Sequence, residues 1–167
     1  MQPTNEAPGV PSVESWSGAV EEALARHRGE RGALLPVLHD IQDRTGHVPP
    51  AAHPRIADAL GLSQADVHGV VTFYHDFRSR PPGRRVIKLC RAEACQAMGS
   101  EALAETLKSL AGTDFGSTSP DAAVTIENVY CLGNCACSPA LMLDGSLEGR
   151  VTAGRLEEIV AEARAGK

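Results

Sequence analysis

The sequence has few aromatic residues, an excess of acidic over basic side chains, and no apolar run long enough to cross a membrane. One Trp, two Tyr and three Phe among 167 residues leave the packing of a core to aliphatic side chains. The formal net charge of −5 is opposite in sign to the basic footprint of a nucleic-acid-binding protein. The first residues lack the basic start and apolar stretch of a signal peptide. We therefore expect a soluble, cytoplasmic chain with no membrane span and no nucleic-acid partner.

Several catalytic and redox motifs are also missing. No C-x-x-C pair occurs, so thioredoxin-type dithiol exchange is not expected. No G-x-G-x-x-G loop follows a strand-like run, which argues against a dinucleotide site. All six histidines lie at or before His75, away from the cysteines, so a Rieske centre with two histidine ligands is not expected either. We predict that this chain contains no catalytic residue.

Four of the five cysteines form two close pairs in the second half of the sequence. Cys90 and Cys95 have the spacing C-x4-C, and Cys131 and Cys135 have the spacing C-x3-C after 35 intervening residues. Each pair follows an apolar run, so it lies where a strand would end in a loop. Two such pairs on neighbouring loops can place four thiolates around one small site, as a [2Fe-2S] cluster requires. These four cysteines are the candidate metal- and cofactor-binding residues.

Other roles for the cysteines are less consistent with the spacing. Structural zinc also takes four thiolates, but its close ligands are usually two to four residues apart and often include histidine. Disulfide bonds are not expected in a reducing cytosol. Cys137, two residues after Cys135, is expected to be a small buried residue beside the loop, although its position would also allow a ligand swap.

The sequence divides into four segments. Residues 1–14 contain three prolines and predict a disordered tail. Residues 15–76 show helical periodicity, with Ser63 as an N-cap, and predict a small helical bundle. Residues 77–85 contain two prolines and four arginines and predict a linker. This linker is either a solvent-exposed hinge or a strip that docks onto an acidic surface. Residues 86–167 follow a strand–helix–strand–strand–helix order, typical of a compact α/β layer.

Three stretches, together with the cysteine spacing, resemble a known family. They are the loop C-L-G-N-C-A-C-S-P at 131–139, T-G-H-V-P at 45–49 and G-V-V-T-F-Y at 69–74. Over residues 18–165 the chain resembles the thioredoxin-like 2Fe-2S subunit of respiratory complex I, of NAD-linked hydrogenases and of soluble molybdenum-containing NAD-dependent formate dehydrogenases. The resemblance implies an α/β (α+β) fold, in which a small N-terminal helical bundle precedes a thioredoxin-like [2Fe-2S] domain.

The resemblance also implies roles for residues and partners. Cys90 and Cys95 would hold one iron, and Cys131 and Cys135 the other, in an electron-transfer subunit that is not catalytic alone. FMN, NAD and the molybdenum cofactor would lie only in partner subunits. These partners would be a flavin- and NAD-binding subunit and, through it, a molybdenum-containing catalytic subunit.

The first cysteine loop indicates which member of this family the chain resembles most. It lacks the Gly-Thr that many family members carry before the second cysteine, and in this it is most like the γ subunit of the formate dehydrogenases. The equivalent subunit of NADH:quinone oxidoreductase or of NAD-reducing hydrogenase is the alternative. A docking module with a structural cluster or zinc is an alternative of another class.

Overall fold

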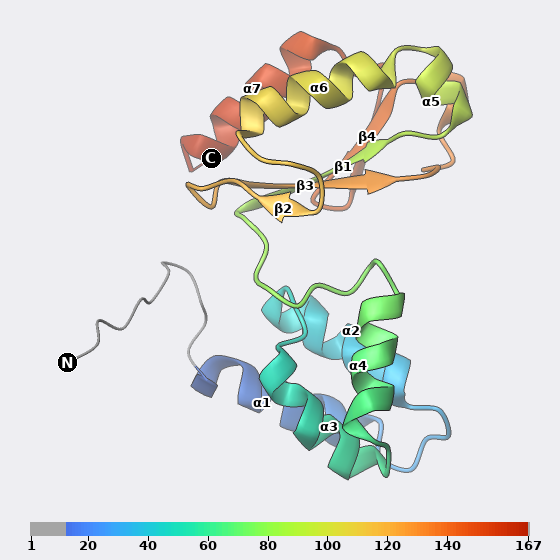
Figure 1. Cartoon of the computed structure of the whole chain (residues 1–167), viewed down its shortest axis with the longest axis vertical. Coiled ribbons are helices and arrows are strands. Elements are labelled where there is room, and N and C mark those ends of the chain that lie inside the picture. Colours follow the sequence, from blue (N-terminus) through green and yellow to red (C-terminus); the bar gives the residue numbers. More distant parts are fainter. Residues whose placement is uncertain (1–12, 167) are drawn as a thin grey trace, which may run out of the picture. The chain divides into compact units, whose positions relative to one another are not determined.

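The computed structural model describes residues 13–166, which form two compact units that meet in sequence at Pro81 and Pro82 (Figure 1). The predicted tail lies outside the described residues except for its last two positions, where the first helix has already begun. None of the described helices combines the length and the apolar composition needed to cross a bilayer. The first unit is helical and the second is an α/β layer, so the predicted fold class is confirmed.

The helical unit consists of four α-helices and one short 3₁₀ turn. The elements are α1 (Val13–Arg26), α2 (Leu34–Thr45), η1 (Pro50–Ala52), α3 (His53–Leu60) and α4 (Gln64–Phe73). Glycines in the left-handed region end two of the helices, with Gly46 following α2 and Gly61 following α3. The predicted N-cap of α4 is confirmed as a capping box, in which Ser63 and Asp66 each bind the other's backbone N–H.

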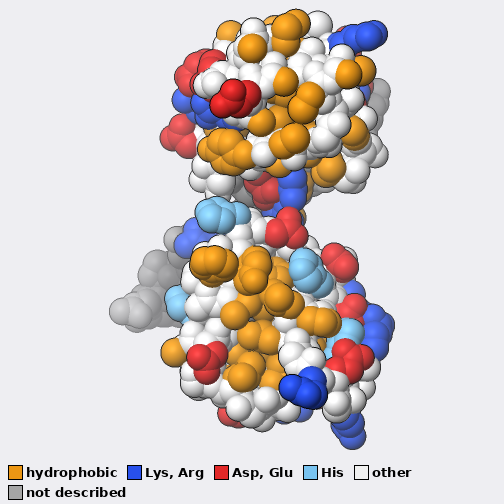
Figure 2. Space-filling view, turned by 90° about the vertical axis from the view of Figure 1, so that its right-hand side faces the viewer, with side chains coloured by type: hydrophobic (Ala, Val, Ile, Leu, Met, Phe, Trp, Pro, Cys, Tyr) orange, Lys and Arg blue, Asp and Glu red, His pale blue; other side chains and the backbone are white. Residues whose placement is uncertain are grey.

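Aliphatic residues fill the core of the helical unit, as the scarcity of aromatic residues predicts. Fully buried members come from all four helices and from the connection after α2: Val20, Val37, Leu38, Ile41, Val48, Ile56 and Val67. The outer surface of α4 is different, because it carries few charges and leaves Phe73 73% exposed. Figure 2 shows hydrophobic side chains gathered on one face of this unit, and its exposed large apolar residues are Leu62, Phe73 and Tyr74.

The second unit is a five-stranded mixed sheet covered by helices. The strands are β1 (Arg85–Cys90), β2 (Ser117–Thr118), β3 (Val124–Val129), β4 (Ala140–Leu143) and β5 (Ser146–Gly149), in the order β2-β3-β1-β4-β5. The helices are α5 (Glu93–Ala97), α6 (Ser100–Ala111) and α7 (Ala153–Arg164), with a 3₁₀ turn, η2, at Cys135–Cys137. In Figure 1, α6 and α7 lie side by side over one face of the sheet.

The central strands of the sheet determine where the cysteine loops lie. Strand β1 pairs parallel with β3, so that Cys90 at the end of β1 is opposite Val129 at the end of β3. Parallel strands release the chain at the same sheet edge. Two elements of this unit, α5 and β2, were not predicted from the sequence.

Two of the four arginines around the predicted linker are engaged within the second unit. Arg84 donates two hydrogen bonds to the carbonyl oxygen of Ala163 in α7, at 3.1 and 3.2 Å. Arg85 opens β1, one residue earlier than predicted, and its guanidinium lies 2.8 Å from the Asp144 carboxylate. These contacts leave less of the basic stretch available for a partner than the sequence implied.

A buried glutamine fixes the chain where it leaves α4. The side chain of Gln42, on α2, donates to the Asp76 carbonyl oxygen and accepts from the Arg78 backbone N–H, both at 2.7 Å. Gln42 is 8% exposed, so water cannot readily replace these hydrogen bonds. One side chain therefore satisfies two backbone groups of an irregular segment.

We expect Gln42→Met to lower the unfolding free energy of the helical unit by about 1–3 kcal/mol, because two partly buried hydrogen bonds from a buried side chain are lost. The sole tryptophan, Trp16, packs against this unit's core, so its fluorescence during urea unfolding reports on this unit. Gln64→Met, at an exposed position of α4, is the matched control. Equal unfolding midpoints for the two variants would contradict this role for Gln42.

Candidate metal centre

The first cysteine pair lies in the interior of the second unit. Cys90 is the last residue of β1 and Cys95 lies on the short helix α5; each is only 2% exposed. Both pack with Ala140, the first residue of β4, and with the half-buried side chains of Val129 and Leu132. The sheet and α5 therefore hold these two sulfurs in a largely apolar setting.

The second pair lies on a loop at the protein surface. Cys131 follows β3 after one residue and Cys135 begins the turn η2; both are exposed. Their Sγ atoms are 4.0 Å apart, close to the separation of about 3.8 Å for two thiolates on one tetrahedral metal with 2.3 Å bonds. Cys131 has a φ of +112°, a conformation that costs about 1–3 kcal/mol in a residue with a side chain.

Backbone N–H groups converge on the sulfurs. Gly133, with a φ of +76°, donates its N–H to Cys131 Sγ at 3.4 Å, a conformation that glycine adopts without steric cost. The N–H groups of Ala92, Leu132 and Cys131 lie near the Cys90 sulfur, where they lower the pKa of that thiol. Because two of these donors belong to the second loop, they join the two cysteine pairs into one site.

These contacts change the acidity of the thiols in opposite directions. Burial raises the pKa of Cys90, but the N–H donors and the Cys95 thiol outweigh it, so the pKa is lowered. The hydrogen bond with Cys131, and then its charge, raise the pKa of Cys135. The site therefore stabilises a thiolate at its inner end, as a metal ligand requires.

Ser138 forms a further link between the loops. The Cys95 thiol lies 3.5 Å from the Ser138 hydroxyl, which in turn donates to the Cys135 carbonyl oxygen at 2.8 Å. The sequence did not predict this contact, because Ser138 lies 43 residues from Cys95. The one feature that could have pointed to Ser138 is its position in the C-L-G-N-C-A-C-S-P loop.

The two cysteine pairs suit the two irons of a binuclear cluster. Structural zinc needs three or four ligands around one ion. A [2Fe-2S] cluster instead takes two thiolates on each of two irons, which matches two separate pairs held on neighbouring loops.

Three neighbours of the site make contacts of their own, and one of them, Cys137, is less buried than predicted. The Gly99 N–H donates to the Gln96 carbonyl oxygen at 3.0 Å, so Gly99 turns the chain into α6. Arg91 is neither free in solvent nor directed at the cysteines. Its guanidinium pairs with Glu101 and lies 5.6 Å from the centre of the Phe115 ring. Cys137 is half-buried, with its carbonyl oxygen bound to the backbone of Arg150 at 2.7 Å.

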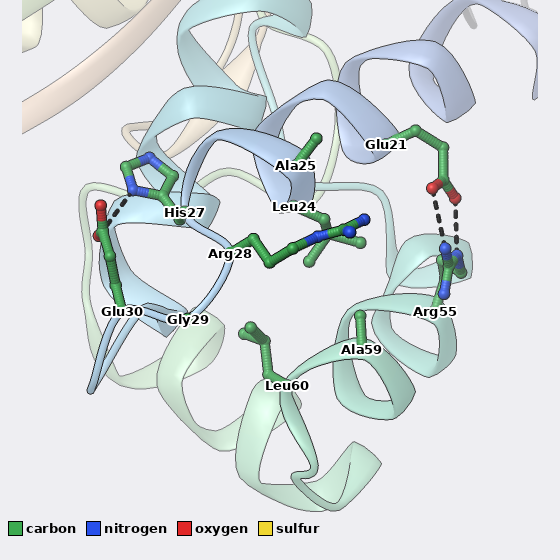
Figure 3. A pocket seen from close by; sticks show the side chains of 10 residues that line it. All are labelled: Glu21, Leu24, Ala25, His27, Arg28, Gly29, Glu30, Arg55, Ala59 and Leu60. Carbon is green, nitrogen blue, oxygen red and sulfur yellow. Dashed lines mark hydrogen bonds and ion pairs between the residues drawn. The ribbon is translucent and has the colours of Figure 1, made fainter.

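The helical unit has a groove of its own, which contains no cysteine. It has a volume of about 730 Å³ and lies between α1, the following turn and α3 (Figure 3). Leu24, Ala25, Ala59 and Leu60 provide its apolar lining. Its charges are largely paired, since Arg55 binds Glu21 at 2.6 Å and His27 binds Glu30 at 2.9 Å. The groove is open and shows no convergent reactive groups.

Comparison with known proteins identifies the family. Residues 20–164 match the thioredoxin-like [2Fe-2S] ferredoxin family. An NADH-quinone oxidoreductase subunit of Rhizobium meliloti is 34% identical over 148 residues, which cover 89% of this chain and 88% of that protein. The NAD-reducing hydrogenase HoxS subunit alpha of Cupriavidus necator is 31% identical over 144 residues, which cover 86% of this chain but only 24% of that longer one.

A solved structure supports the same relationship. The crystal structure of an NAD⁺-reducing [NiFe]-hydrogenase in the H₂-reduced state contains a chain that matches with a TM-score of 0.69 and 25% identity. The match covers 80% of this chain and 22% of the hydrogenase chain. The likeness thus extends over most of this protein but over a minor part of the larger hydrogenase chain.

The difference in burial between the two cysteine pairs predicts their chemical reactivity. In cluster-free, reduced protein we expect iodoacetamide to modify Cys131 and Cys135 about tenfold or more faster than Cys90 and Cys95. Burial should outweigh the lowered pKa of Cys90, because Cys90 and Cys95 are each only 2% exposed and the reagent cannot readily reach their sulfurs. Peptide mass spectrometry over a time course measures the rates, and urea-unfolded protein is the control. Faster modification of Cys90 than of Cys131 would contradict the structure.

Proposed function

The chain belongs to the thioredoxin-like [2Fe-2S] ferredoxin family, and from this premise we propose that it is the electron-transfer subunit of an NAD-linked oxidoreductase complex. The cluster supplies one-electron transfer when it is bound. The observation that carries the proposal is the convergence of four cysteines from two loops at the shared end of β1 and β3. The chain contributes no catalytic residue of its own.

We assign the ligands by pairs. Cys90 and Cys95 would hold one iron and Cys131 and Cys135 the other. The protein would orient these thiolates through the N–H donors described above, and it would exclude water from the inner pair by packing against Ala140. Hydrogen bonds to the sulfurs, such as that from Gly133, are one of the ways in which a protein sets the potential of such a cluster.

The exposed pair indicates the side from which electrons would enter or leave. Cys131 and Cys135 are exposed, and Tyr130, directly before Cys131, is 74% exposed. Met98, three residues after Cys95, is 62% exposed. Exposed apolar side chains beside a redox site are typical of a docking surface. We place a flavin- and NAD-binding subunit against this loop, with FMN and NAD in that partner.

The helical unit would contribute a second contact to the complex. Figure 2 shows hydrophobic side chains gathered on one of its faces, and its exposed large apolar residues are Leu62, Phe73 and Tyr74. We regard it as a better anchor than the arginine-rich linker, because Arg84 and Arg85 are already engaged within the second unit. Anchoring by the helical unit is compatible with electron transfer by this chain, because the cysteine site lies in the second unit.

A more specific question is which substrate the whole complex uses. The relatives support a subunit of the NADH-quinone oxidoreductase or NAD-reducing hydrogenase type more than the formate dehydrogenase γ type. The formate assignment, with a molybdenum-containing catalytic partner, rests on the first cysteine loop alone. It remains the narrower proposal, and the complex purified with its natural partners decides between them.

Substitution tests the ligand assignment. We expect Cys90→Ser, Cys95→Ser, Cys131→Ser and Cys135→Ser each to lose most of the iron or to alter the visible spectrum, since each removes a thiolate. Cys137→Ser should keep the parent spectrum and two irons per chain. Visible absorption and metal analysis provide the measurements. A colourless parent containing zinc would overturn the cluster assignment, and bleaching by Cys137→Ser would overturn the ligand set.

Activity assays test the role of the chain in a complex. The isolated chain should not oxidise NADH with an artificial electron acceptor, because it has no dinucleotide loop. The complex captured through a tag on this chain should oxidise NADH. Reduction of NAD⁺ with formate would identify a formate dehydrogenase, reduction of NAD⁺ with hydrogen a hydrogenase, and reduction of quinone an NADH:quinone oxidoreductase. Turnover of NADH by the isolated chain at the rate of the complex would refute the proposal.

A further inference from the structure

We propose that Gly149, at the end of β5, is a positioning residue that holds the second cysteine loop in place for the cluster. The inference rests on the proposed ligation by Cys131 and Cys135. It concerns a contact that no cysteine pattern reveals, because Gly149 lies 14 residues beyond Cys135 in the sequence.

The contact leaves no room for a side chain. A Cβ atom at Gly149 would lie 2.7 Å from Cys137 Cβ, 2.8 Å from the Cys137 carbonyl oxygen and 2.7 Å from Asn134 Nδ2. Ordinary contacts of a Cβ atom begin near 3.4 Å. Any residue other than glycine would therefore push the loop away by roughly 0.7 Å or displace the strand.

Two hydrogen bonds fix the loop to the chain directly after Gly149. Arg150 donates its N–H to the Cys137 carbonyl oxygen at 2.7 Å, and Val151 donates to the Pro139 carbonyl oxygen at 3.0 Å. Arg150 has a φ of +54°, the left-handed region that a residue with a side chain adopts at a cost. Gly149 also pairs with Ala140 in the antiparallel β4–β5 ladder, so the segment that contacts the cysteine loop is itself part of the sheet.

The attachment acts on a ligand through the turn that contains it. Cys135 begins η2 and Cys137 ends it, and the Cys137 N–H closes the turn onto the Asn134 carbonyl oxygen at 3.0 Å. Cys135 is exposed and has no core packing to hold it, unlike Cys95. Apart from the hydrogen bond of Ser138 to its carbonyl oxygen, its position depends on the contact between Cys137 and Gly149. In this arrangement the fifth cysteine contributes its Cβ atom and carbonyl group, and its sulfur is dispensable.

The test compares Gly149→Ala with Gly154→Ala, a matched change at a glycine with open space and an ordinary φ. Full-length protein loaded with cluster is examined by the EPR g values after dithionite reduction and by the rate of iron release to a chelator. We expect Gly149→Ala to shift the g values and to release iron about tenfold faster, with Gly154→Ala like the parent. Parent-like g values and release in a folded Gly149→Ala protein would overturn the inference.

A second pair of variants applies if Gly149→Ala does not fold. Cys137→Ala keeps the Cβ atom that rests on Gly149, whereas Cys137→Gly removes it, and both lack the sulfur. Faster iron release from Cys137→Gly than from Cys137→Ala supports the inference, and equal rates overturn it. A parent chain that binds no iron would instead refute the proposed function, so the two failures are distinguishable.

Discussion

The parallel pairing of β1 with β3 is the constraint on which the site depends. Its register places Cys90 opposite Val129, and both strands then release the chain at one edge of the sheet. A slip of one residue would move every side chain of β1 to the opposite face, and Cys90 would leave the interior. In this register the backbone N–H groups of Leu132 and Cys131 lie near the Cys90 sulfur and help to lower its pKa.

Around this register, the protein holds its two cysteine pairs by different means. The inner pair is held by burial among apolar side chains, which tolerates little movement. The outer pair is held by backbone hydrogen bonds, by a residue at positive φ and by the close approach of β5. The inner end of the site is thus enclosed, while the outer end is accessible. This difference suits an electron-transfer protein, which protects its redox group from solvent and also exchanges electrons with a partner.

The sequence predicted those features that depend on neighbouring residues. The Ser63 cap of α4 and the placement of both cysteine pairs at the ends of strands are local patterns, and the structure contains both of them. Features that depend on distant contacts were not predictable. The crowding at Gly149, the pairing of Arg85 with Asp144 and the two hydrogen bonds of Gln42 join residues that only the folded chain brings together.

The composition of the large core in the second unit has a consequence for how the protein matures. That core is built from aliphatic side chains of the sheet, α6 and α7, and it includes none of the five cysteines. Its hydrophobic stabilisation is therefore independent of metal, in contrast to zinc fingers, which are unfolded without their ion. The polypeptide can therefore fold around this core before iron and sulfide are bound.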